Sequence, residues 1–210
     1  MKTPARLLTY KFVFLLAMIT LSPLAKAAMN PPNQPDRETA YLAGGCFWGM
    51  EDLARAIPGV LETEVGYTGG HMPRGVYEQV RTGRTGHAES LKIVFDPRRV
   101  TYQHLLFEFF RMHNPTTRNQ QGNDIGTQYR SAIFYVGDEQ KQTARKVIQT
   151  VDASGEWKAP IVTEVVLFKE FYRAEEYHQK YLVKNPDGYT CHYPRRMDLG
   201  EKKLLELVSP

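Results

Sequence analysis

The stretch "YLAGGCFWGMED" (residues 41–52) sets the pattern from which the rest of the domain is predicted. It begins as a short apolar strand, and apolar residues then recur at helical spacing until Pro58 stops the helix. Cys46 therefore lies at a strand-to-helix turn, where free N–H groups and the helix dipole favour an anion. We expect its thiol to lose a proton more readily than at its free pKa of about 8.5. The adjacent glycines let another group approach the sulfur closely, although an inert buried cysteine is the simpler alternative.

The start of the 210-residue chain has the pattern of an export signal. Positive charges precede an apolar run at 12–21, and Ala25-Lys26-Ala27 is a small-x-small cleavage site. The apolar run is shorter than the roughly 20 residues that span a bilayer. Residues 1–27 are therefore predicted to be a signal peptide, and the mature protein to be periplasmic or secreted without stable membrane insertion.

The charge of the mature chain excludes one broad class of function. The formal net charge is +4, and residues 1–27 carry four of the cations and no acids, so the remainder is close to neutral. No basic stripe typical of nucleic-acid binding remains. Residues 28–37 read as a proline-rich linker, and 38–210 as one catalytic domain with a core of its own. The two cysteines, Cys46 and Cys191, could form a structural disulfide or a redox couple, and composition does not decide between them.

Hydrophobic periodicity predicts an α+β fold. Strands are expected at 38–43, 60–67, 89–95, 131–136 and 162–167, and helices at 47–57, 101–112, 138–151, 170–184 and 201–208. The order β-α-β-β-α-β predicts a ferredoxin-like core, a mixed sheet with helices packed on it, followed by C-terminal additions. The long polar loop at 114–130 is a candidate functional segment, and the tail is expected to be irregular from about residue 185.

Five motifs together resemble one known family. They are "GGCFWG" (44–49), "VGYTGG" (65–70), "TGHAES" (85–90), "GNDIGTQYRSAIFY" (122–135) and "NPDGYTCHY" (185–193). In this order they are similar to the peptide methionine sulfoxide reductases of the A type, from about Tyr41 to Tyr193. Reduction of a sulfoxide by a thiol needs a nucleophilic sulfur, a proton source for the departing oxygen and an apolar seat for the S-methyl group.

The resemblance implies a role for each matching residue. Cys46 matches the nucleophile, and Glu89 matches the acid, whose pKa burial would raise. Because an ionised Glu89 would oppose a Cys46 thiolate, their titrations are expected to be coupled. Tyr77 and Tyr129 match the phenols that hold the oxygen, and Asp124 a supporting acidic residue. Phe47 and Trp48 match the methyl pocket, although they could equally be ordinary core aromatics.

The resemblance also implies the rest of a catalytic cycle. Cys46 would become a sulfenic acid, and Cys191 would condense with it to a disulfide that a thioredoxin-like dithiol reduces. The substrates would be proteins, peptides or free amino acid carrying methionine S-sulfoxide, with no bound cofactor or metal and a monomeric enzyme. Two features depart from the family: no further cysteine follows Cys191, and "HMPRGV" (71–76) replaces an asparagine-proline pattern before Tyr77.

Three other functions compete. A zinc enzyme is suggested by His87-Ala88-Glu89, but the P-C-x-x-C half of that signature is missing. A cysteine hydrolase would pair Cys46 with a histidine, yet no histidine is marked as its base; His178 and His192 are expected at the surface. The third alternative is an exported, non-catalytic binding domain with a Cys46–Cys191 disulfide.

Overall fold

The computed structural model describes residues 36–208. The predicted signal peptide at 1–27 and all but the last two residues of the predicted linker at 28–37 lie outside that range, so they stay predictions. Across the described residues, no helix combines the length and the apolar character that crossing a membrane requires.

The core is a six-stranded mixed sheet in the order β7-β6-β1-β3-β2-β8. The four inner strands pair antiparallel, and β7 joins β6 in parallel. The four inner strands come from two β-α-β units. The first unit is β1 (Glu38–Gly44), α1 (Phe47–Arg55) and β2 (Val60–Thr68). The second unit is β3 (Ala88–Phe95), α3 (Tyr102–Met112) and β6 (Ser131–Tyr135). This is the predicted ferredoxin-like arrangement. Later elements extend it, namely α4 (Asp138–Ser154), β7 (Glu164–Leu167), β8 (Phe171–Arg173), α5 (Tyr181–Lys184) and α6 (Glu201–Val208).

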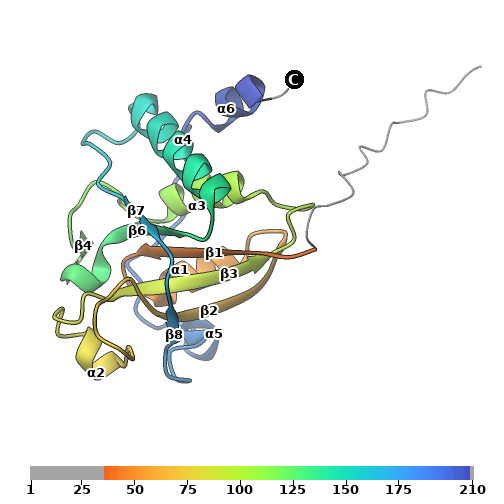
Figure 1. The fold of residues 1–210 in the computed structure, drawn as a ribbon. Helices are drawn as coiled ribbons and strands as arrows, with labels where there is room; N and C mark the ends of the chain where they lie inside the picture. Colours follow the sequence, from red (N-terminus) through yellow and green to blue (C-terminus); the bar gives the residue numbers. More distant parts are fainter. Residues whose placement is uncertain (1–35, 209–210) are drawn as a thin grey trace, which may run out of the picture. The chain divides into compact units, whose positions relative to one another are not determined.

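The sheet is curled, because its two edge strands are joined by only three residues. β7 ends at Leu167 and β8 begins at Phe171, on opposite edges of the strand order. Four extended residues span about 14 Å at most, whereas the edges of a flat six-stranded sheet lie about 24 Å apart. The connection crosses one face of the sheet (Figure 1), where Phe168 stacks on Tyr41 with ring centroids 3.9 Å apart.

The main core lies between the sheet and helices α1, α3 and α4. Helix α3 begins where Thr101 accepts a hydrogen bond from the His104 N–H, as its sequence predicts. Its buried face carries three phenylalanines, Phe107, Phe109 and Phe110, each at most 1% exposed. Helix α1 packs its apolar side against β2 and β3, so the turn before it, which holds Cys46, is fixed against the centre of the sheet.

The predicted helix at 170–184 is wrong. Residues 171–173 form strand β8 on the edge of β2, and only Tyr181–Lys184 is helical. Buried polar contacts with distant residues hold the intervening turn: the Gln179 side chain donates to the Val65 carbonyl and accepts from the Val65 N–H. Lys180 has a positive φ of 50°, which breaks a helix at this point.

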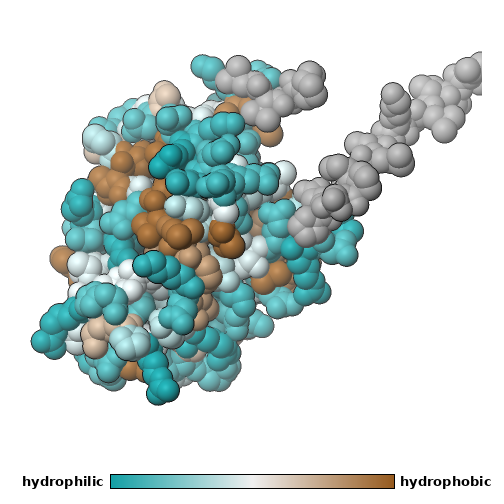
Figure 2. Space-filling view, viewed as in Figure 1, coloured by the Kyte–Doolittle hydropathy of each residue, from teal (hydrophilic) through white to brown (hydrophobic). Residues whose placement is uncertain are grey.

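The predicted loop at 114–130 contains short elements. They are β4 (Gln120–Gln121), β5 (Asp124–Ile125) and a 3-10 turn (Thr127–Tyr129), and a further short helix, α2 (Tyr77–Val80), precedes β3. On the face shown in Figure 2, apolar side chains gather over β6 and β7, where Val166 and Leu167 are partly exposed.

The carboxylate of Glu51 joins α1 to the turn before α5. It is 1% exposed and accepts hydrogen bonds from Thr63 Oγ1 at 3.0 Å and from the Lys180 N–H at 2.7 Å. Glu51→Ala removes the acceptor of both donors and leaves the buried Thr63 hydroxyl without this partner, so the free energy of unfolding should fall by about 2 to 4 kcal/mol.

Denaturant unfolding measures the effect, with Glu62→Ala as the control. Glu62 makes one exposed ion pair, with Arg37, and its loss should cost less than about 1 kcal/mol. Equal losses in the two variants would show that Glu51 is not an anchor.

Candidate active site

The first turn of α1 brings Cys46 to Glu89. Cys46 is the N-cap residue of the helix and is 6% exposed, and Glu89 is the second residue of β3 and is 3% exposed. The Phe47 N–H donates to Glu89 Oε2 at 3.2 Å. One of the free amides at the helix start therefore binds the carboxyl group, next to the cysteine, as expected for an acceptor at a helix N-terminus.

The pKa of the Cys46 thiol is raised, contrary to the expectation from the helix N-terminus. Burial is the largest cause, and the charge of Glu89 adds to it. The Trp48 N–H lowers the pKa, but not enough to compensate. The dipole of this nine-residue helix supplies at most about half a charge, which burial and a neighbouring carboxylate outweigh here. In the structure Cys46 is therefore a neutral thiol.

Glu89 carries a proton at neutral pH. Burial raises its pKa to about 8, the Phe47 hydrogen bond opposes that shift, and the charge of Asp124 adds to it. A neutral carboxylic acid donates a hydrogen bond and transfers a proton, which a solvated glutamate at this pH does not do. Cys46 and Glu89 thus hold two protons between them, and losing one gives either of two isomers: a thiolate beside an acid, or a thiol beside a carboxylate.

Two phenols from different segments face this pair. Tyr77 begins α2 and Tyr129 ends the 3-10 turn. Burial raises the pKa of both, and the charge of Glu89 raises it further. Glu175 positions the first of them, accepting from the Tyr77 N–H at 2.9 Å and from Tyr67 Oη at 2.9 Å. The site therefore has two protonated phenols and one acid.

The apolar side of the site is formed by Phe47 and Trp48 with a buried histidine. Trp48 stacks on Tyr181, with centroids 3.8 Å apart, and its Nε1–H donates to His178 Nδ1 at 3.0 Å. His178 also contacts the rings of Phe47 and Tyr77. At 1% exposure, His178 is not the surface residue that the sequence predicted. Its separation of 130 residues from Trp48 explains why local pattern did not reveal it.

Asp124 holds the second cysteine. Its Oδ2 accepts from Cys191 Sγ at 3.3 Å and from Tyr189 Oη at 3.2 Å. Both cysteines are free thiols, and burial followed by this hydrogen bond raises the pKa of Cys191 to about 12. The tail around residue 191 is irregular, as predicted, yet it lies against the Cys46 turn.

The glycines before Cys46 leave space that side chains of the protein itself occupy. A Cβ at Gly45, whose φ is +107°, would lie 2.5 Å from Gln121 Cγ. Gln121 was not among the predicted site residues; its Nε2 donates to the Gly44 carbonyl, and its Oε1 accepts from the Asn114 N–H. Within this apoprotein structure the close approach therefore comes from the 114–130 loop. Gln121 is buried and bonds to two separate segments of backbone, and no local sequence pattern predicts such a role for a glutamine.

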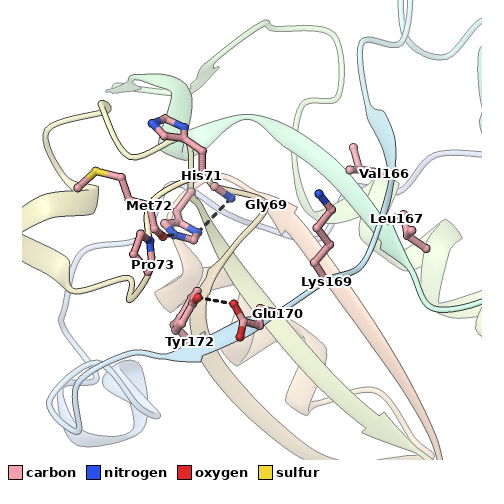
Figure 3. A pocket seen from close by; sticks show the side chains of 11 residues that line it. Gly69, His71, Met72, Pro73, Val166, Leu167, Lys169, Glu170 and Tyr172 are labelled. Atoms are coloured by element: carbon pink, nitrogen blue, oxygen red, sulfur yellow. Dashed lines mark hydrogen bonds between the residues drawn. The ribbon is translucent and has the colours of Figure 1, made fainter.

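A separate hollow lies between the β7–β8 connection and the loop at 69–73, and Cys46 does not line it (Figure 3). His87 is one of its lining residues. The Gly70 N–H donates to His87 Nδ1 at 3.1 Å, and His87 Nε2 faces the Met72 carbonyl at 2.8 Å. Both ring nitrogens are engaged within the protein, so His87 fits a structural role better than that of a metal ligand. Among residues 36–208, no group of three or more histidine, cysteine or acidic side chains could hold a metal ion.

Cys46 and the seven residues predicted around it thus come from six separate segments and meet at the N-terminus of α1. They comprise a thiol nucleophile, a neutral acid, two phenolic donors, two aromatic walls, a second thiol and its carboxylate partner. This set is suited to binding a polar oxygen beside an apolar group and to removing that oxygen with two thiols.

Comparison with known proteins gives a consistent result. The family model described as peptide methionine sulfoxide reductase matches residues 38–206. The chain is 56% identical over 160 residues to the peptide methionine sulfoxide reductase MsrA of Nocardia farcinica, covering 76% of this chain and 92% of that protein.

Two solved structures agree. Mxr1 from Saccharomyces cerevisiae in reduced form has a TM-score of 0.73 at 39% identity, covering 77% of this chain and 93% of that one. Methionine sulfoxide reductase A of Corynebacterium diphtheriae has a TM-score of 0.71 at 40% identity, covering 78% and 82%. A further structure of Mxr1, in complex with Trx2, is 24% identical and supports the fold alone.

The backbone at Gly45 provides a test of the site's construction. Gly45→Ala would strain a left-handed backbone and press its Cβ against Gln121, so the free energy of unfolding should fall by about 2 kcal/mol or more. Gly137→Ala is the matched control, because its φ is −153° and nothing lies within 4 Å of the added Cβ. Its effect should stay within about 0.5 kcal/mol. If thermal or denaturant unfolding gives both variants the same stability, Gln121 does not pack closely against Gly45.

Proposed function

The chain belongs to the peptide methionine sulfoxide reductase family, and from that premise we propose that it repairs oxidised proteins by reducing methionine S-sulfoxide through a sulfenic acid on Cys46. It is an oxidoreductase that reduces methionine sulfoxide. The observation that carries the detailed proposal is the buried pair of Cys46 and Glu89, joined through the Phe47 amide at 3.2 Å.

In the proposed complex the sulfoxide oxygen points to the polar side of the site. The protonated Glu89 and the hydroxyls of Tyr77 and Tyr129 donate to it. The S-methyl group lies against Phe47 and Trp48, whose rings are held by His178 and Tyr181. Only one epimer at sulfur places the oxygen and the methyl group on their own sides while the sulfur faces Cys46, which supports selectivity for one epimer, and the family resemblance implies that it is the S epimer.

Oxygen transfer begins when the Cys46–Glu89 pair gives up one of its two protons. The Cys46 thiolate attacks the sulfoxide sulfur, and Glu89 transfers its proton to the oxygen. The sulfur–oxygen bond of the substrate breaks, the oxygen ends on Cys46 as a sulfenic acid, and methionine leaves. The cysteine sulfur is oxidised by two electrons and the substrate sulfur is reduced by two. Glu89 is then a carboxylate.

Cys191 resolves this intermediate in the proposal. Its sulfur attacks Cys46, the sulfenic hydroxyl leaves with a proton as water, and a disulfide forms. The contact of 3.3 Å between Cys191 Sγ and Asp124 Oδ2 provides a carboxylate to take the thiol proton. Before oxidation, burial and this same contact keep the Cys191 thiol protonated.

A thioredoxin-like dithiol is the proposed reductant of the disulfide. The structure of reduced Mxr1 is 39% identical in sequence to this chain. Mxr1 has also been solved in complex with Trx2, and this supports the proposal. We also propose that the enzyme acts as a monomer outside the cytoplasm, in the periplasm or secreted, as the signal-like pattern at residues 1–27 suggests.

Glu89 should control both the rate of oxygen transfer and the pH dependence of that rate. With the pKa of Glu89 near 8, the second-order rate of methionine formation should rise through pH 8 and then level off, because the reactive pair has lost one proton. In Glu89→Gln the rate should fall by about 10² to 10⁴, and the inflection near pH 8 should vanish.

Rapid-quench single turnovers with a peptide carrying the S-sulfoxide measure this, the R epimer serving as the blank. Cys46→Ser gives the zero of the assay, because a serine hydroxyl is a poor nucleophile towards sulfur. A Glu89→Gln rate within about twofold of wild type, or an unchanged inflection, would remove Glu89 from the mechanism.

Cys191→Ser should separate the two halves of the cycle. One equivalent of methionine should form, because Cys46 alone carries oxygen transfer, and dimedone should then trap a sulfenic acid on Cys46. Turnover driven by thioredoxin should stop, since no disulfide is available for it to attack. Mass spectrometry and a coupled turnover assay on one sample report both. Sustained thioredoxin-linked turnover would show that Cys191 is not the resolver.

A further inference from the structure

His192 follows Cys191 directly and lies beneath the nucleophile turn. The sequence placed it at the surface, whereas the structure leaves it 6% exposed. Its Nδ1 lies 3.1 Å from the Met112 carbonyl, to which only a protonated nitrogen donates, its Nε2 is buried, and the ring also interacts with the Cys46 backbone. Burial lowers the pKa of the ring, so the neutral form with the proton on Nδ1 is the one present.

The imidazole lies along the glycine side of α1. A Cβ at Gly45 would lie 3.2 Å from His192 Cε1, and a Cβ at Gly49 would lie 2.9 Å from His192 Cδ2. Since Nε2 lies between these two carbons, that edge of the ring faces the backbone on both sides of Cys46. Two glycines of the "GGCFWG" motif thus make room for His192.

The residue on the other side of Cys191 is held against the same helix. Thr190 Oγ1 accepts from the His192 N–H at 3.1 Å, which closes a turn around Cys191. A Cβ at Gly49 would collide with Thr190 Oγ1 as well. Cys191 itself packs against Gly122 and donates to Asp124. The cysteine is therefore held on both flanks by α1 and at its sulfur by the 114–130 loop.

We propose that His192 is a positioning residue for disulfide formation: its ring, seated between Gly45 and Gly49 and bonded to the Met112 carbonyl, holds Cys191 where its sulfur can reach oxidised Cys46. This rests on the proposed function, in which Cys191 is the resolving cysteine. Formation of an intramolecular disulfide depends on holding two sulfurs in an attacking geometry, and small displacements cost large factors in rate. His192 does not contact the side chains proposed to bind the sulfoxide, so its substitution should not affect oxygen transfer.

The test compares the two steps in His192→Ala during a single turnover of the S-sulfoxide peptide. Quenched samples give methionine formed, sulfenic acid trapped by dimedone, and the Cys46–Cys191 disulfide. We expect methionine formation within about twofold of wild type and disulfide formation slowed at least about tenfold, with sulfenic acid accumulating between them. His192→Asn, which keeps a side-chain donor, should recover part of the lost rate. His104→Ala, at a half-buried histidine on α3, is the matched control and should leave both steps unchanged.

Gly49→Ala tests the same contact from the helix side. Alanine favours a helix over glycine by about 1 kcal/mol, so α1 itself should not weaken, yet the new Cβ would displace Thr190 and His192. This variant should show the same selective loss of disulfide formation, and it decides the matter if His192→Ala fails to fold.

Two results would overturn the proposal. Disulfide formation at the wild-type rate in His192→Ala and Gly49→Ala would show that positioning does not depend on this contact. Equal slowing of methionine formation and disulfide formation would assign His192 a general structural role. Failure of the proposed function is distinguishable, because wild-type enzyme would then form no Cys46–Cys191 disulfide after reducing the sulfoxide.

Discussion

The hydrogen bond from the Phe47 N–H to Glu89 Oε2 is the contact on which the site depends. It joins the first turn of α1 to the start of β3, and so holds Cys46, the proposed nucleophile, beside Glu89, the proposed acid. An amide at a helix start needs an acceptor, and a buried carboxyl group needs a donor; each satisfies the other. The curled sheet and the packing of α1 on β2 and β3 fix both ends of this bond.

The electrostatics of the pair follow from competition between burial and the helix terminus. A cysteine at a helix N-terminus is ordinarily more acidic, but here burial and the carboxyl group raise the pKa of Cys46. The same burial keeps a proton on Glu89. The pair therefore holds Cys46 as a thiol and Glu89 in the acid form, and the proposed reaction begins with the loss of one proton from it. Burial and the hydrogen bond to Asp124 likewise raise the pKa of Cys191 and keep it protonated.

Local sequence signals account for most of the fold but only part of the site. Short apolar stretches, one of them alternating (60–67), placed the four inner strands, the cap at Thr101 placed α3, and helix α6 has the bounds that were predicted for it. The helix expected at 170–184 failed because long-range contacts, such as that of Gln179 with Val65 across 114 residues, override local propensity. His178 and His192 were missed for the same reason, since each is buried by residues far away in the sequence. Motif position selected Tyr77 and Tyr129 among twelve tyrosines, which composition does not distinguish.

The central claim is that Glu89 keeps its proton at neutral pH because it is buried beside Cys46. Infrared difference spectroscopy across a pH titration tests it directly, with Glu89→Gln identifying the carboxyl band and Cys46→Ser the S–H band. We expect a protonated carboxyl band at pH 7 that disappears near pH 8, with the S–H band still present at pH 7. A Glu89 band that titrates near the ordinary glutamate pKa of about 4.3 would contradict it.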